Sequence, residues 1–321
     1  MSGWVLGVDF GTTTTVAAQL DPMAGAAQPL ILSQHGAAMP SAVFVETASR
    51  IAVGEHALGC AHLDPSRFYA APKRLVALTQ TTIQVGVEQV PATVIVAAVL
   101  RSALAAAQTA RGGSQPAGIV LTHPVNWSAD QIQVLLDAAQ QVGYPAHLVR
   151  AVPEPLACAQ HWARTGVIRP DQPVLVVDIG GGATTAAALR PNPHGSFDIA
   201  AAHSEAALSG RSFDAAVRRW AEDQLSSRNP RLLAALREPA AVRESRALDD
   251  AVRTAKETLS ATSETTVDIA ADGRRETLTL TRPELEGLVD ADVRRIVEAA
   301  RAAAPQAGPR PVICLTGGSS R

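Results

Sequence analysis

Aromatic residues and cysteines are scarce in this 321-residue chain. Phe, Trp and Tyr make up only 3% of it, which leaves few surfaces for stacking. The cysteines Cys60, Cys158 and Cys314 are widely spaced and include no Cys-x-x-Cys pair, which favours reduced core thiols over disulfides or metal ligands. The eight histidines form no His-Glu-x-x-His cluster, which argues against a structural zinc site.

The chain also has no excess of positive charge and no long apolar run. Its 28 Lys and Arg against 30 Asp and Glu give a net charge of -2, so there is no electrostatic basis for binding nucleic acid. The apolar stretch Thr93–Leu104 is too short to cross a bilayer and includes Arg101. The N-terminus lacks the charged and apolar regions of a signal peptide. The sequence therefore predicts a cytoplasmic protein with no membrane-spanning segment.

One uncommon motif occurs twice. An apolar run precedes Asp9-Phe-Gly11-Thr-Thr-Thr near the N-terminus, and another precedes Asp178-Ile-Gly180-Gly-Gly182 in the middle of the chain. Each copy predicts a buried strand, a glycine-rich turn and a returning strand. Glycine lets backbone N–H groups approach an anion, and an Asp at the strand end can hold a cation or water beside it. Two such hairpins facing each other would bind the phosphates of a nucleotide and its metal.

The rest of the chain alternates between predicted strands and helices, which favours an α/β architecture. Residues 212–260 are charged, alanine-rich and helical in pattern, with breaks near Asn229-Pro230 and Pro239. Other helices are expected at 92–110, 128–142, 156–164 and 283–304. Further strands are expected near 83–87, 118–124, 148–153, 197–202, 265–269, 276–280 and 311–316. The length suits two lobes better than one compact core.

Several short motifs occur in a fixed order along the chain. They are Lys73-Arg74-Leu-Val, Leu121-Thr-His-Pro124-Val-Asn-Trp127, Pro153-Glu154-Pro155, Gly210-Arg-Ser-Phe213-Asp214, Ala255-Lys256-Glu257-Thr-Leu-Ser260 and Leu315-Thr-Gly317-Gly-Ser319-Ser-Arg321. With the two hairpins, this ordered set resembles the nucleotide-binding domain of the DnaK family of heat-shock chaperones, within the actin-like ATPase superfamily. The resemblance implies two similar lobes, each a duplicated β-sheet plus helices, around a nucleotide cleft. Lobe I is expected at 1–167 with an inserted subdomain at about 38–113, and lobe II at 168–321 with one at about 209–283.

The resemblance also implies roles for individual residues, with ATP or ADP and Mg²⁺ as cofactors. Asp9 and Asp178 would bind the metal, Lys73 would contact the γ-phosphate and the attacking water, and Glu154 would align that water. The phosphates would be bound by Gly11, Thr12, Thr13, Gly180, Gly181 and Gly182. The adenosine would be bordered by Lys256, Ser260, Gly317, Gly318, Ser319 and Arg321.

The chain departs from the family pattern in four places. Ala183 and Thr185 replace a threonine and an aspartate in the second hairpin, which removes a hydroxyl and a carboxylate. Arg253 and Glu257 exchange the charges of the adenosine-side helix. Ile132 replaces an arginine that signals to the substrate domain, and the sequence stops at Arg321 inside the adenosine-binding turn, so it is expected to be truncated relative to the family.

These observations predict an ATP-binding domain with slow Mg²⁺-dependent hydrolysis, in which lobe closure signals to an attached region or a protein partner. The departures at Ala183, Thr185, Arg253 and Glu257 keep an alternative open. In that alternative, a degenerate actin-like fold acts as a protein-interaction or regulatory module with weak or no nucleotide binding. A sugar kinase of the same fold fits the Lys73-Arg74 and Gly317-Gly318 motifs less well, and a polymerising ATPase is disfavoured because the sequence has no obvious subunit-contact signature.

Overall fold

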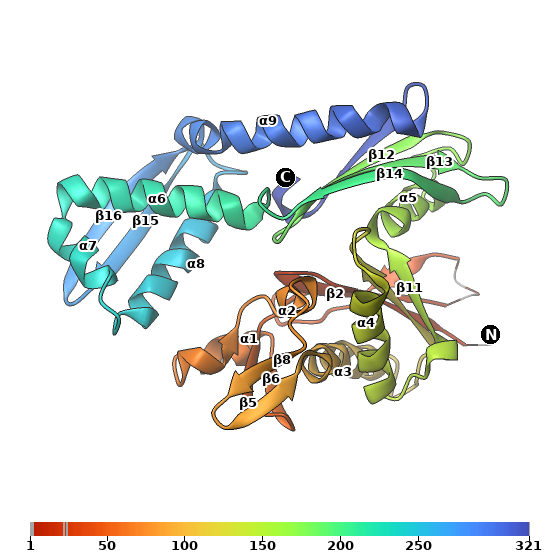
Figure 1. Cartoon of the computed structure of the whole chain (residues 1–321), viewed down its shortest axis with the longest axis horizontal. Helices are drawn as coiled ribbons and strands as arrows, with labels where there is room; N and C mark the ends of the chain where they lie inside the picture. Colours follow the sequence, from red (N-terminus) through yellow and green to blue (C-terminus); the bar gives the residue numbers. More distant parts are fainter. Residues whose placement is uncertain (1–2, 22, 24, 321) are drawn as a thin grey trace.

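A computed structural model describes residues 3–21, 23 and 25–320, and two main β-sheets organise it. Each sheet belongs to one lobe, and the lobes lie one above the other in Figure 1. The lobe I sheet has the order β11-β10-β1-β2-β3, with β4 also pairing β2. These strands are β1 Val5–Phe10, β2 Thr14–Leu20, β3 Ala27–Pro29, β4 Ala38–Pro40, β10 Gly118–His123 and β11 Val149–Pro153.

The lobe II sheet repeats the central part of this arrangement. Its order is β14-β13-β12-β17, with β12 Val174–Ile179, β13 Thr184–Pro191, β14 Phe197–Glu205 and β17 Val312–Thr316. In both sheets, the strand that ends in the motif Asp pairs antiparallel with the next strand and parallel with a later one, β10 or β17. The α/β actin-like fold expected from the repeated motif is therefore confirmed.

Three helices lie next to the lobe I sheet in sequence, α3 Ala92–Ala110, α4 Ala129–Gln141 and α5 Glu154–Arg164, close to the ranges predicted from the sequence. Helices α3 and α4 pack in the core of lobe I, whereas Ala159 of α5 is buried with strands of the lobe II sheet. The N-terminus of α4 has a capping box, in which Ser128 Oγ accepts from Gln131 N and the Gln131 side chain accepts from Ser128 N. The Gln131 amide also donates to the carbonyl oxygens of Val76 and Ala77 at 3.1 Å each, which joins α4 to helix α2 Lys73–Ala77.

Helix α3 corrects one expectation. By length and composition, its residues Ala92–Ala110 could cross a membrane, so the prediction that no run is long enough is wrong. The expectation placed the apolar run only at 93–104, whereas the helix continues through alanines to Ala110. About 56% of the apolar window is buried inside lobe I, where Ile95 and Val99 are fully covered. Its hydrophobicity is therefore that of a core helix.

The first inserted part of lobe I follows β4 and is built from short elements. Strands β5 Val43–Thr47, β6 Arg50–Val53 and β7 Phe68–Tyr69 form one small sheet, and β8 Thr82–Val85 and β9 Glu88–Pro91 form a hairpin. Helix α1 Glu55–Cys60 and the 3-10 turn Pro65–Arg67 connect them. Two further 3-10 turns lie at Ala146–Leu148 and Gly318–Ser320.

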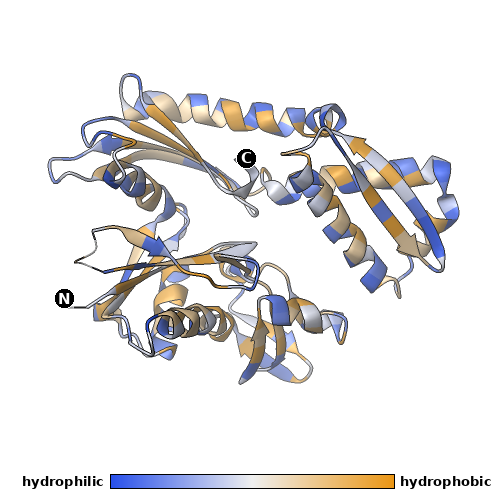
Figure 2. Cartoon of the chain, turned by 180° about the vertical axis from the view of Figure 1, so that it is seen from behind, coloured by the Kyte–Doolittle hydropathy of each residue, from blue (hydrophilic) through white to orange (hydrophobic). Residues whose placement is uncertain are grey.

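The insertion of lobe II is the mostly helical region predicted for 212–260, followed by a hairpin. It contains α6 Gly210–Arg228, α7 Pro230–Leu236, α8 Val242–Thr258, β15 Glu264–Ala271 and β16 Arg274–Thr281. The expected hairpin turn is present, with positive φ at Asp272 and Gly273. Figure 2 shows apolar and hydrophilic residues alternating along β15 and β16, which matches one buried face. Helix α9 Arg282–Ala307 then runs back over the lobe II sheet (Figure 1).

Candidate functional site

The two motif hairpins turn in the same way. Gly11 N donates to Thr14 O at 3.1 Å, and Gly180 N donates to Ala183 O at 3.0 Å. A Cβ at Gly11 would collide with the carbonyl oxygen of Thr14, so glycine is needed for this close turn. Ser41 supports the first turn, because its hydroxyl donates to Gly11 O at 2.8 Å. The sequence predicted only a turn at Ser41 and missed this contact.

The hairpins approach each other directly. A Cβ built on Gly181 would collide with the Thr13 hydroxyl, and one built on Gly182 would collide with the Thr12 side chain. The structure therefore brings together four of the six residues expected to bind phosphate across the boundary between lobes, and Gly11 and Gly180 join them through their turns. Backbone N–H groups in two facing glycine-rich turns suit an anion.

Asp9 and Asp178 end their strands beside these turns. Thr122 Oγ1 donates to Asp9 Oδ1 at 2.8 Å, a contact that fixes the carboxylate and that sequence reasoning did not assign. Burial raises the pKa of Asp178 to about 7, and the nearby carboxylates of Glu154 and Asp9 add to the increase, while Lys73 opposes it. Asp178 is thus electrostatically close to Glu154, Asp9 and Lys73.

Lys73 and Glu154 form an ion pair, with 2.6 Å between Nζ and Oε1. Lys73 begins α2 and is 6% exposed, and Glu154 begins α5. The ammonium group also lies 5.5 Å from the centre of the Trp127 ring. A lysine buried to this extent needs a charged partner, and Glu154 supplies it. His123, whose Nδ1 lies 2.9 Å from Pro124 O, holds the turn after β10 as the sequence suggested.

The residue types at the centre suit Mg²⁺. Among the described residues, no group of three His, Cys, Asp or Glu side chains is arranged to hold a metal by itself. Mg²⁺ is commonly bound by one or two carboxylates together with waters and substrate phosphates. Burial is the main cause of the raised pKa of Asp178, and the carboxylates of Glu154 and Asp9 add to it, so a cation bound there would favour the charged form of Asp178.

The adenosine-side residues gather around Gly210. A Cβ there would collide with the Ser319 hydroxyl and would lie 3.5 Å from Lys256 Nζ. Lys256 Nζ donates to Gly210 O at 3.2 Å and lies 2.6 Å from Asp214 Oδ1, an ion pair without hydrogen-bond alignment. The sequence analysis named Asp214 only as part of a motif. That its carboxylate pairs with Lys256 is seen only in the structure.

Gly317 joins this group to Asp178. Its φ is +87, and a Cβ there would collide with Asp178 and with the carbonyl of Ile179. Gly318 lies in the following 3-10 turn. Ser260 is exposed beyond the end of α8, and in the described part of the chain its side chain makes no hydrogen bond to this group. Arg321 lies outside the described residues.

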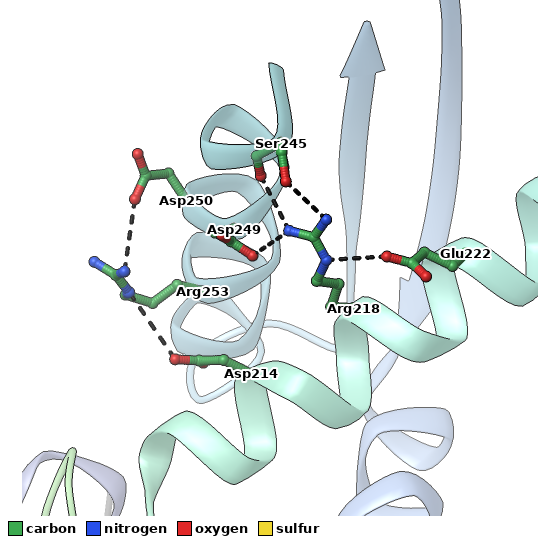
Figure 3. Close-up of polar contacts among 7 residues, drawn as sticks. All are labelled: Asp214, Arg218, Glu222, Ser245, Asp249, Asp250 and Arg253. Carbon is green, nitrogen blue, oxygen red and sulfur yellow. Dashed lines mark hydrogen bonds and ion pairs between the residues drawn. The ribbon is translucent and has the colours of Figure 1, made fainter. Parts of the chain in front are cut away.

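Thr185 and Arg253, two of the positions that depart from the family pattern, contact other side chains of this chain. Thr185 Oγ1 lies 2.8 Å from Ser204 Oγ, so its hydroxyl is engaged with β14. Arg253 lies between two helices, with Nε 4.0 Å from Asp214 Oδ2 and Nη2 3.6 Å from Asp250 Oδ1 (Figure 3). Figure 3 also shows Arg218 of α6 bound to Asp249 and Ser245 of α8 and to Glu222 of its own helix.

The fold and the paired hairpins define a two-lobed α/β domain of the actin-like ATPase type. Residues 75–321 match the model of the Hsp70 protein family, and the chain belongs to that family. It is 29% identical to the chaperone protein HscA of Pectobacterium carotovorum over 98% of this chain and 52% of that protein. It is 30% identical to the chaperone protein DnaK of Elusimicrobium minutum over 91% of this chain and 47% of that protein.

These comparisons confirm the resemblance expected from the motifs, namely an Hsp70-type nucleotide-binding domain. A homologue of HscA from Acidithiobacillus ferrooxidans is 27% identical over 98% of this chain and 52% of its own length. The chain thus spans about half the length of the curated relatives it matches.

Proposed function

We propose that this chain binds ATP and ADP with Mg²⁺ between its lobes and hydrolyses ATP slowly. One observation carries the proposal: two facing Asp-x-Gly hairpins from different lobes adjoin a buried Lys73–Glu154 ion pair. Phosphoryl transfer to water requires positioning and charge neutralisation more than covalent chemistry. The backbone donors of the two turns, the buried ammonium group and the carboxylates from both lobes meet these requirements.

Each residue has a role that follows from its placement. Thr12, Thr13 and the backbone of Gly180–Gly182 would bind the phosphates, since these turns meet at the lobe boundary. Asp9 and Asp178 would hold Mg²⁺ and its waters, and the bound ion would neutralise phosphate charge. Lys73 would contact the γ-phosphate while Glu154 orients the attacking water, because their ion pair places both groups together.

The nucleoside end would lie against Gly317, Gly318, Ser319 and Lys256. This assignment is supported by the packing of Gly210 against Ser319 and Lys256, next to the Gly180 carbonyl that accepts from Gly210 N. Ser260 and Arg321 are proposed only by resemblance. The lobe and subdomain boundaries given above, and the cytoplasmic location, stay predictions.

Closure of the lobes would signal to another protein region which nucleotide is bound. Hairpins that touch through Thr12 and Gly182 can approach or separate as the phosphates between them change. Relatives of about twice this length are named chaperones, so the receiver of the signal would be a protein region beyond this one or a separate partner.

The test is isothermal titration of ATP and ADP with Mg²⁺, followed by single-turnover hydrolysis. We expect micromolar or tighter binding of nucleotide. Asp9→Ala should abolish this binding, whereas the control Asp171→Ala, at an exposed position, should leave it unchanged. Asp171 is a surface carboxylate that pairs with Arg169 at 3.5 Å, so its loss changes charge equally without touching the site. Binding that survives Asp9→Ala would contradict the assignment.

A second candidate function rests on the second hairpin. Ala183 offers no hydroxyl and Thr185 is engaged with Ser204, so neither supplies the group that the family places beside the phosphate and metal. Loss of one positioned group costs about 10²–10³ in rate. If nucleotide binds without turnover, the chain is an interaction module that responds to nucleotide. Absence of binding at millimolar ATP would favour the degenerate module.

A further inference from the structure

Three parallel strands of lobe I end side by side at the proposed site. Strand β10 lies between β1 and β11 in the sheet and runs parallel to both. Asp9 is the next-to-last residue of β1, and Glu154 follows directly after β11. The end of β10 and the turn after it, residues 122–127, therefore lie between two carboxylates that the proposed function uses. That function assigns no role to this segment.

The first residue of this segment contacts the carboxylate of β1. Thr122 Oγ1 donates to Asp9 Oδ1 at 2.8 Å, and both residues are half-buried. A hydroxyl that donates to one carboxylate oxygen fixes the plane of the group and leaves the second oxygen available for a ligand. Mg²⁺ demands nearly ideal octahedral geometry, so the orientation of a carboxylate ligand affects how tightly the ion binds. Thr122 is therefore placed to orient Asp9.

The last residue of the segment contacts the ammonium group of Lys73. Trp127 is buried in the core of lobe I, and the centre of its ring lies 5.5 Å from Lys73 Nζ. An indole ring attracts a cation to its π face, and the attraction is stronger when both groups are shielded from water. The ring has no net charge, so it does not repel a phosphate as a second carboxylate beside Glu154 would. Trp127 is thus suited to restrain Lys73 while the ammonium exchanges Glu154 for a phosphate oxygen.

A closed turn joins these two contacts. Trp127 N donates to Pro124 O at 3.2 Å, and Nδ1 of the buried His123 lies 2.9 Å from the same carbonyl oxygen. The proline ring fixes φ within the turn. Few conformations are therefore open to the turn, and the positions of Thr122 and Trp127 are linked.

We propose that Thr122 and Trp127 are positioning residues for the two lobe I groups of opposite charge that act on the nucleotide. Thr122 orients the carboxylate of Asp9. Trp127 restrains the ammonium group of Lys73. This inference rests on the proposed function, because it uses the roles of Asp9 and Lys73 given there. The two contacts affect different steps, the first the binding of Mg²⁺ with the nucleotide and the second the hydrolysis.

The first test removes the hydroxyl group of Thr122 and keeps the shape of the side chain. Thr122→Val should raise the Mg²⁺ concentration needed for half-maximal ATP binding in isothermal titration by about ten-fold or more. Thr122→Ser keeps the hydroxyl and should restore the original requirement. The matched control is Thr277→Val, because Thr277 Oγ1 donates to Asp268 Oδ1 at 2.6 Å in the β15–β16 hairpin. An unchanged Mg²⁺ requirement in Thr122→Val overturns the role of Thr122.

The second test removes the ring of Trp127. Trp127→Leu keeps an apolar side chain and should lower single-turnover hydrolysis by about ten-fold, whereas the Mg²⁺ requirement stays unchanged. Trp127→Phe keeps a π face and should recover part of the rate. In a chain that carries Lys73→Met, Trp127→Leu should cause no further loss, because the ring acts through the ammonium group.

A second tryptophan provides the control for this test. Trp220 is half-buried on α6 of lobe II, and Trp220→Leu should leave the hydrolysis rate unchanged. Equal rates for Trp127→Leu and Trp220→Leu overturn the role of Trp127. A further loss when Trp127→Leu is added to Lys73→Met overturns it as well, because the ring would then act by another route.

Measurements without nucleotide separate this inference from the proposed function. Denaturant unfolding of single and double variants gives the coupling of Trp127→Leu with Lys73→Met and of Thr122→Val with Asp9→Asn. We expect each coupling to change the unfolding equilibrium constant by about five-fold or more. Absence of both couplings overturns the inference. Coupling in a chain that binds no ATP supports the positioning of both groups and contradicts the proposed function instead, so the two failures are distinguishable.

Discussion

The guanidinium group of Arg246, on α8 of lobe II, lies 4.6 Å from the ring centre of Phe68, on β7 of lobe I. The same group donates to Ala61 O and to Pro65 O, each at 3.1 Å. One side chain thus joins the inserted parts of the two lobes, away from the hairpins. Charged hydrogen bonds and a cation–π contact at a half-buried site stabilise this junction.

Removing that junction should speed nucleotide release. Arg246→Ala deletes both hydrogen bonds and the ring contact, and we expect the release rate of a fluorescent ADP analogue to rise about ten-fold in stopped-flow measurements. Arg243→Ala is the control, since Arg243 is exposed on the same helix. Equal release rates for the two variants would show that the junction does not restrain the lobes.

Lys73→Met should separate hydrolysis from binding. The substitution keeps the length of the side chain but removes the ammonium group that pairs with Glu154. We expect single-turnover hydrolysis to fall by about 10²-fold or more, with ATP affinity changed only a few-fold. Arg164→Met, at an exposed position near the end of α5, is the charge-matched control. Unchanged hydrolysis in Lys73→Met would remove Lys73 from the mechanism.

Asp178 should make stability fall with increasing pH in the absence of nucleotide. Its pKa in the folded chain is about 7, well above the ordinary value of 3.8 for an aspartate, so between these two values the folded state holds a proton that the unfolded state has released. Its contribution is present below the unfolded pKa and is lost as pH rises through about 7. Asp178→Asn should flatten this dependence in thermal unfolding and abolish the Mg²⁺ dependence of nucleotide binding. A variant with the same pH profile as the unchanged chain would contradict the assignment.

Gly182→Ala should block the approach of the hairpins. Its Cβ would collide with Thr12, whose side chain belongs to the other lobe. We expect at least ten-fold weaker ATP binding by titration, since a bulky group in a close contact costs about 1–3 kcal/mol. Thr12→Gly in the same chain should restore part of the affinity by removing the colliding atoms.

A matched glycine provides the control for that substitution. Gly287 lies within α9, and a Cβ there would meet no atom within 4 Å. Gly287→Ala should leave ATP binding unchanged and raise stability by up to about 1 kcal/mol, because alanine favours the helix. If Gly182→Ala behaves in the same way as Gly287→Ala, the hairpins do not meet as described.

Most of the fold could be predicted from local patterns. The repeated Asp-x-Gly turns and the breaks at Asn229-Pro230 and Pro239 matched the ends of strands and helices, because turn and cap chemistry is local. The resemblance implied that Lys73 and Glu154 both act on the attacking water, and the structure places the two side chains in contact.

The contacts between distant segments could not be predicted in this way. The junction of Arg246 with Phe68 depends on how the inserted parts of opposite lobes are oriented, which no periodicity specifies. The range of α3 agrees with the predicted helix at 92–110, but its capacity to span a membrane was missed because only Thr93–Leu104 was counted as apolar. Arg101 is exposed, and an arginine is tolerated on the exposed face of a core helix.

The link from Gln131 to α2 ties the position of Lys73 to a distant part of the chain. Helix α2 has five residues and no side-chain cap, and so short a helix is not stable alone. Its final carbonyls are bound by an amide that is itself oriented by Ser128, and 55 residues separate Gln131 from Val76. The start of α4 is thus an outside support for the helix that carries Lys73, so a change at Ser128 can disturb a lysine that it never touches.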